Sequence, residues 1–323
     1  MDRIITNYTG IGVNLMSVAT FLFLCSALLA AAPSYAGTDM AVATRYFEKK
    51  DYPAALKEIR PLAESGNVDA QYNLGVMYDK GLGVSRNAAE AVKWYRKAAE
   101  RGQSLAQFNL GIMYQHGELG DPDSAEAARW FRLAADQDIV EAQYSLGVMY
   151  HRGEGVSQDY KEALHWYRRA GKRGFAAALY NLSVMYRRGE GVVKSIEEST
   201  KLYQQSAKAG DSDAQYSLGE LYEKGEWVNS DPVAACHWYQ LAAGQEHHEA
   251  QYRLGRLYEK GFGVHQDFVL GYLWYNLAAA GGLEAARTAR DNLALRMTPA
   301  QIAEGQKMSR EWRPKQVKEQ THK

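Results

Sequence analysis

Small and apolar residues recur along this chain with the spacing of an α-helix, and the whole pattern then repeats. In the stretch YNLGVMYDKGLGV, residues 72–84, leucine precedes a glycine and tyrosine follows it three positions later. Spacings of three and four place such side chains on one helical face. This anchor position returns every 36 residues, which predicts six copies of one unit. The six anchors are Gly75, Gly111, Gly147, Ser183, Gly219 and Gly255.

Each copy predicts two helices joined by a short loop. The first helix covers about residues 69–80 in the first copy and ends at Gly81, because glycine accepts the positive φ of a helix C-terminus. The second covers about residues 87–101 and starts at a residue whose side chain can cap it. Glu90, three residues on, supplies the acidic half of a capping box. The six predicted caps are Asn87, Asp123, Asp159, Ser195, Asp231 and Asp267.

The many aromatic residues follow from the small residues beside them. Gly75 and Ala70 let the two helices of a copy approach closely, and rings such as Trp94 fill the remaining space. One copy cannot bury its apolar face alone, whereas stacked copies can. The fourth copy carries Ser183 and Leu202 where the others have glycine and tryptophan, so we expect it to pack less ideally.

The pattern A-x-Y-x-L-G-x-x-Y-x-x-G-x-G-V, followed by D-x-x-x-A-x-x-W-Y-x-x-A-A, resembles the Sel1-like repeat, a relative of the tetratricopeptide repeat. The resemblance covers about residues 66–284. It implies an all-α fold, a right-handed α-solenoid of antiparallel helix pairs that acts as an adaptor for other proteins. The predicted organisation is a signal peptide (1–36), an N-terminal capping helical segment (37–68), six repeats (69–284), C-terminal capping helices (285–312) and a disordered tail (313–323).

The N-terminus predicts export. Residues 11–32 carry no charge, and the small residues Ser34 and Ala36 are typical of a signal-peptide cleavage site after Ala36. We expect a periplasmic or cell-surface protein. The alternative is an inner-membrane anchor formed by residues 11–32, because the apolar run is long for a signal. After cleavage Cys236 remains as a single cysteine, so the exported chain would lack an internal disulfide.

Composition excludes some classes of function. Lys and Arg number 38, as do Asp and Glu, and a formal net charge of zero argues against a nucleic-acid partner. The sequence lacks the motifs of a P-loop, a G-x-S-x-G nucleophile or an H-E-x-x-H metal site. The adjacent His247 and His248 lack a third spaced ligand. We therefore expect neither enzymatic activity nor a metal or cofactor.

The resemblance also implies that the first helix of each copy lines a concave face. Positions two before, one after and five after the anchor lie opposite the invariant side and form an amide or hydroxyl track, an apolar track and a basic track. Amides can clamp the backbone of an extended peptide, and basic side chains favour acidic ones. The predicted groove residues are Asn73, Val76, Lys80, Asn109, Ile112, Ser145, Val148, Arg152, Asn181, Val184, Arg188, Ser217 and Lys224.

The predicted function is therefore a scaffold for an extended or acidic protein segment, with a membrane as partner only if the N-terminal segment is not cleaved. A different class remains open: an envelope polysaccharide- or peptidoglycan-binding protein, or a hydrolase. Exposed tryptophans would favour sugar binding, because an indole face can stack on a sugar. Buried tryptophans beside an open stripe of amides and cations would favour peptide binding.

Overall fold

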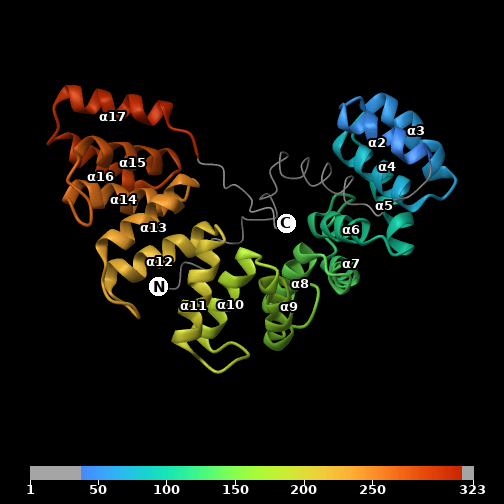
Figure 1. Ribbon diagram of the computed structural model, residues 1–323, viewed down its shortest axis with the longest axis horizontal. Helices are drawn as coiled ribbons and strands as arrows, with labels where there is room; N and C mark the ends of the chain where they lie inside the picture. Colours follow the sequence, from blue (N-terminus) through green and yellow to red (C-terminus); the bar gives the residue numbers. More distant parts are fainter. Residues whose placement is uncertain (1–37, 315–323) are drawn as a thin grey trace. The chain divides into compact units, whose positions relative to one another are not determined.

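The computed structural model describes residues 38–314, and within this range the secondary structure is entirely helical. The predicted signal peptide and all but the first two residues of the predicted tail lie outside the described residues. The chain divides into two compact units, unit 1 (Met1–Ile139) and unit 2 (Val140–Lys323). Each unit is a stack of antiparallel helix pairs (Figure 1).

The described part of unit 1, residues 38–139, contains three helix pairs, and consecutive helices contact each other along this stack. The last two pairs are repeats one and two, and the first pair stands before them. The helices are α2 (Thr38–Glu48), α3 (Tyr52–Glu64), α4 (Val68–Lys80), α5 (Ala88–Glu100), α6 (Ser104–His116) and α7 (Ser124–Asp136).

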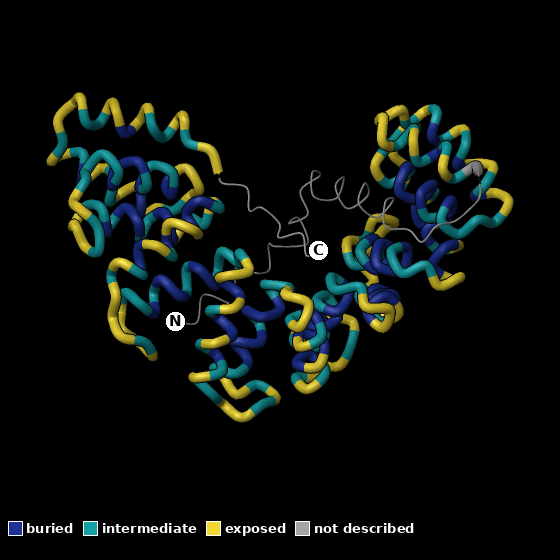
Figure 2. Tube along the Cα trace, in the orientation of Figure 1, coloured by how far each residue is buried: buried dark blue, intermediate teal, exposed yellow. Residues whose placement is uncertain are grey.

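Unit 2 contains repeats three to six, and two further helices pack against its last repeat helix, α15. Buried residues lie along the sides on which the helices face one another (Figure 2). The helices are α8 (Val140–Arg152), α9 (Tyr160–Lys172), α10 (Ala176–Arg188), α11 (Ile196–Lys208), α12 (Ser212–Lys224), α13 (Pro232–Gly244), α14 (His248–Lys260), α15 (Phe268–Ala280), α16 (Glu284–Ala294) and α17 (Pro299–Glu311).

The helix boundaries fall where the sequence predicts them. Every first helix is followed by the predicted glycine, with φ between 65° and 76°. At the second helices the predicted cap accepts from a backbone N–H; the Asn87 side chain, for example, accepts from the N–H of Glu90 at 3.1 Å. Glycine at one end and a short polar side chain at the other therefore set the length of each pair.

The glutamates of the predicted capping boxes have a different partner. The carboxylate of Glu90 accepts from the indole N–H of Trp94 at 3.1 Å, one turn further along the helix rather than back at the cap. The same bond joins Glu126 to Trp130 at 3.0 Å. A largely buried indole needs an acceptor for its N–H, and this need decides where the carboxylate points.

A glycine packed against an aromatic ring joins the two helices of each repeat. A Cβ added at Gly147 would lie 2.6 Å from a ring carbon of Tyr167, which is itself fully buried. The anchor glycines of repeats one, two, five and six meet Tyr95, Phe131, Tyr239 and Tyr275 at 2.6 to 2.7 Å in the same way. The ring can lie flat over the first helix only because no Cβ stands in its place.

Repeat four shows what happens without this glycine. Ser183 occupies the anchor, and the rings of Tyr180 and Tyr203 meet edge to face at 73°. In the other five repeats the equivalent rings are tilted by 36° to 46°. The serine at the anchor therefore goes with a reoriented ring, although Ser183 and Tyr203 stay buried.

We expect Gly147→Ala to destabilise unit 2 and Gly171→Ala to leave it intact. The first change drives a methyl group into the Tyr167 ring, and this overpacking should outweigh the gain in helix propensity by about 1–2 kcal/mol. At Gly171 an added Cβ meets only the tips of Leu179 and Leu182, at 3.1 Å and 3.4 Å. The other five repeats already have alanine in this column. The urea unfolding midpoints of the two variants would test this prediction. Equal midpoints would contradict the idea that the aromatic ring requires glycine at the anchor.

Candidate functional site

In unit 1 the predicted groove residues lie on α4 and α6 and are mostly buried. Asn73 and Asn109 are only 7% and 5% exposed, and Val76 is 2% exposed. Ile112 is half-buried, and Lys80 at the end of α4 is exposed. The amide nitrogen of Asn109 is buried without a hydrogen-bond partner in the described part of the chain. In this unit only the basic track is fully open to solvent.

In unit 2 the same gradient runs along the predicted residues of α8, α10 and α12. Residues of the amide or hydroxyl track are half-buried, namely Ser145, Asn181 and Ser217. In the apolar track Val148 is half-buried and Val184 is buried. The basic track ends each helix at the surface, with Arg152, Arg188 and Lys224 all exposed. The three tracks therefore recur on each of these helices, but their residues differ in exposure to solvent, and only the basic track is exposed throughout.

Stacking explains the burial of the first track. The Asn181 side chain bonds to the phenol of Tyr144 in the preceding repeat, while burial raises the pKa of that phenol to about 12. Arg253 likewise bonds to the phenol of Tyr216, whose pKa burial also raises to about 12. Asn181, which the sequence suggested for clamping a peptide, therefore already binds a tyrosine of the neighbouring repeat, and Arg253 on α14 does the same.

Each cation of the basic track lies beside a carboxylate. Arg152 is 3.4 Å from Glu154, Arg188 is 3.4 Å from Glu190, and Lys224 is 3.5 Å from Glu220; in unit 1, Lys80 is 2.9 Å from Asp79. The Arg152–Glu154 pair is exposed on both sides and contributes about 0–1 kcal/mol, so a partner's carboxylate can replace Glu154 at little cost. The carboxylates beside the other three cations are more covered.

The pair α12 and α14 carries an ionic network that the sequence did not predict. Arg253 lies 2.9 Å from Glu220 and 3.7 Å from Glu223. Glu223 in turn accepts from the hydroxyl of Tyr239 at 2.6 Å. In repeat five these side chains therefore already bind other groups of the same chain.

A second cluster at the start of α12 includes one of the histidines weighed as metal ligands. His247 caps α14, lies 3.2 Å from Asp213 and stacks on Tyr216 with ring centroids 4.6 Å apart. Within residues 38–314, no group of His, Cys, Asp and Glu has the arrangement of a metal site. Asp211, the cap of α12, is surrounded so closely that burial, helped by the charge of Asp213, raises its pKa to about 7.

The tryptophans of the repeats are largely core residues, since Trp94, Trp130 and Trp166 are 7%, 2% and 2% exposed. Trp227, in the loop between α12 and α13, is different. It is 43% exposed and has a positive φ of 66°. Trp227 was not predicted from the repeat pattern. The sequence did hold a signal for it, since four of the six copies have glycine at the position that Trp227 occupies. Those glycines are Gly83, Gly155, Gly191 and Gly263.

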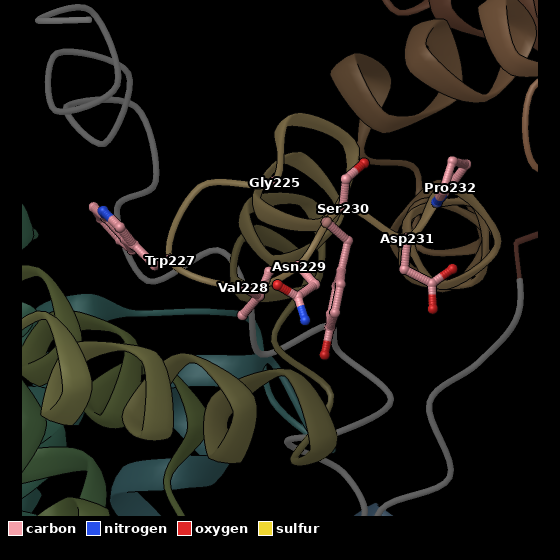
Figure 3. A pocket seen from close by; sticks show the side chains of 8 residues that line it. Gly225, Trp227, Val228, Asn229, Ser230, Asp231 and Pro232 are labelled. Carbon is pink, nitrogen blue, oxygen red and sulfur yellow. The ribbon is translucent and has the colours of Figure 1, made fainter.

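A hollow of about 880 Å³ opens in this loop (Figure 3). Figure 3 shows the Trp227 indole at one end and the Asp231 carboxylate at the other, with Asn229 and Ser230 between them. Its lining residues are Tyr222, Gly225, Trp227, Val228, Asn229, Ser230, Asp231 and Pro232.

We expect Asp211→Asn to stabilise the protein at alkaline but not at acidic pH. Asparagine keeps the cap. A raised carboxyl pKa means that the folded state holds a proton which the unfolded state has already lost. Wild-type stability therefore falls as the pH rises from about 4 to about 7, and the variant should recover up to about 4 kcal/mol above that window.

Thermal unfolding of both proteins at about pH 4 and about pH 8 would test this linkage. The difference in melting temperature should be small at the lower pH and grow at the higher one. A difference of the same size at both values would contradict a titrating Asp211.

None of the described helices is both long and apolar enough to cross a bilayer. The Sel1 repeat family matches the chain six times in succession. The matched residues are 68–103, 104–139, 140–175, 176–211, 212–247 and 248–283, which extend over both units. The comparison with curated proteins gave no match.

Several solved structures are similar. A Sel1 repeat protein from Oxalobacter formigenes is 33% identical, with 79% of this chain and 74% of that chain covered and a TM-score of 0.71. The protective antigen c5321 of uropathogenic Escherichia coli, which displays an SLR fold, is 26% identical over 84% of this chain and 75% of that one, with a TM-score of 0.41. Immunity protein Pa5087 from Pseudomonas aeruginosa is 25% identical over 66% and 81%, with a TM-score of 0.43. With its six matched repeats and stacked helix pairs, the chain belongs to the Sel1 repeat family, whose solenoids are in general scaffolds for protein–protein interaction.

Proposed function

We propose that this chain is a non-catalytic scaffold that binds an extended, acidic segment of another protein along the first helices of unit 2. One observation carries the proposal. Exposed cations occupy the same position at the ends of four successive first helices, α8, α10, α12 and α14. These cations are Arg152, Arg188, Lys224 and Lys260.

Cations that recur at even intervals suit a ligand whose carboxylates also recur at even intervals. An extended segment presents side chains at even intervals, so its carboxylates can meet one cation after another. Arginine adds directionality, because its guanidinium can hold a carboxylate through two parallel hydrogen bonds. Half-buried residues beside the column, such as Val148 and Ser217, would contact the remaining side chains of the segment.

The proposal needs neither a cofactor nor a nucleic acid. The formal net charge is zero, so the cations of the column stand out locally rather than as part of a basic protein. A scaffold of this kind acts by holding its partner, and the column supplies charge without a nucleophile or a general base.

We expect the double change Arg152→Glu with Arg188→Glu to abolish partner binding while leaving helicity unchanged. Each side chain takes part in one weak ion pair, so the double reversal, which also places each glutamate beside a carboxylate, should cost the fold about 2 kcal/mol. The full chain would be used as bait on the native envelope fraction, and the retained proteins quantified by mass spectrometry. The partner should fall by about tenfold or more on the reversed bait, and binding should weaken as salt is raised.

The matched control is Lys172→Glu with Lys208→Glu. These lysines are exposed at the ends of α9 and α11, the second helices of the same two repeats, and the change in net charge is identical. The control bait should retain the partner. If both baits lost the partner equally, net charge rather than the column would be responsible. If neither lost it, the column would not be the binding site.

We also propose that the scaffold works outside the cytoplasm, with cleavage after Ala36. The support is the uncharged run 11–32 followed by small residues. N-terminal sequencing of the protein from its native cell should find a mature chain that begins at Gly37 and fractionates with the periplasm or cell surface. A chain that keeps residues 11–32 and sediments with the inner membrane would favour the anchored alternative.

A further inference from the structure

The loop between α12 and α13 differs from the equivalent loops at two positions, and the first is Trp227. Its backbone has φ of 66°, and the glycines in its column have φ between 68° and 73°. A bulky side chain is strained in this conformation. Strained residues of this kind persist where the surrounding structure enforces them, and they concentrate at functional sites.

The glycines in this column have a packing role that tryptophan cannot fill. A Cβ added at Gly83 would lie 2.7 Å from the backbone of Tyr52, and one at Gly191 would lie 2.7 Å from Cβ of Tyr160. Tyr52 and Tyr160 are the first residues of α3 and α9, so these loops press against the start of the preceding second helix. Trp227 stands in the place of these glycines, and it is 43% exposed.

The second difference is Ser230. In repeats three and six this position holds glutamine, whose side chain folds back over the loop and donates to a carbonyl near the end of the first helix. Gln158 donates to the carbonyl of His151 at 2.9 Å, and Gln266 to that of Glu259 at 2.8 Å. Serine is too short for this bond. We call the glutamine side chain that makes this bond in repeats three and six the strap. Repeat five lacks it, and Ser230 lines the hollow in Figure 3.

The lining of the hollow combines an aromatic plate with uncharged polar groups. Trp227 offers an indole face, Asn229 a carboxamide that donates and accepts, and Ser230 a hydroxyl that does both. All three residues are exposed. The Asp231 carboxylate caps α13 by accepting from Val233 and Ala234, each at 3.0 Å, so its charge faces a helix N-terminus.

We propose that this hollow binds a neutral sugar ring of an oligosaccharide. The C–H face of a pyranose is apolar and packs on an indole plate, whereas its hydroxyls both donate and accept and so match the carboxamide, hydroxyl and carboxylate. A cationic peptide side chain would also stack on Trp227, but it would leave the paired donors and acceptors of Asn229 and Ser230 without the hydroxyl partners that a sugar supplies. This site is separate in chemistry from the proposed protein-binding column and does not rest on it.

Calorimetric titration of the full chain with maltohexaose, cellohexaose and chitohexaose, and separately with a lysine-rich peptide, tests the proposal. One plate and a few hydrogen bonds predict a Kd of about 1 mM for at least one sugar. Trp227→Gly should weaken that binding about tenfold or more. The same variant should raise the melting temperature, because glycine relieves the strained backbone, and this excludes unfolding as the cause of the loss.

Two further variants sharpen the test. Ser230→Gln should restore the strap, close the hollow and weaken sugar binding about as much as Trp227→Gly, although it leaves the indole in place. Phe262→Ala is the control, since Phe262 lies in the loop of the next repeat and is 45% exposed, close to the 43% of Trp227. It should leave the Kd unchanged.

Three results would overturn the proposal. The first is that none of the three sugars binds the wild-type chain. The second is that Trp227→Gly or Ser230→Gln binds sugar as tightly as the wild type does. The third is that the lysine-rich peptide binds at Trp227 in place of the sugars, which would assign the hollow to a cationic protein segment.

Discussion

Five of the six repeats depend on the contact between a bare glycine backbone and a buried aromatic ring. Glycine lowers helix propensity by about 1 kcal/mol relative to alanine, yet it occupies the middle of the first helix in five repeats. The ring that it admits buries a far larger apolar area, which offsets this loss. The ring also brings its hydroxyl to the far side of the first helix, where those of Tyr239 and Tyr275 donate to Glu223 and Glu259 at 2.6 Å and 2.8 Å. One missing Cβ thus positions both apolar and polar contacts.

Because each repeat contacts mainly its neighbours, the helices and the loops are under different constraints. In the middle of the first helix, residues are occupied by stacking, as Asn181 is with Tyr144. Residues at its end can vary and face solvent. A loop can change without disturbing the glycine–ring contacts, which is why repeat five keeps Gly219 against Tyr239 while its loop carries Trp227 and Ser230.

The two proposed surfaces meet in repeat five. Lys224 ends α12 and belongs to the cation column, and the next residue, Gly225, already lines the hollow. The chemistry of the two surfaces nevertheless differs. The column offers charge to carboxylates, and its strength depends on salt. The hollow offers a flat apolar plate with neutral hydrogen-bonding groups, whose strength depends on shape and on displaced water. A single partner that carries both an acidic segment and a glycan could contact both surfaces.

The sequence alone determined the number of repeats, the helix ends and the core role of the aromatic residues, because these follow from local rules that six copies repeat: a glycine that accepts positive φ, a cap that accepts an N–H, and a ring beside a small residue. Only the tertiary structure decided which polar positions are open. Asn73 shares a helical face with Lys80 but is buried, and Glu90 binds an indole rather than the cap. Burial depends on what the neighbouring helix or repeat brings against a side chain, and helical periodicity within one copy carries no information about that neighbour.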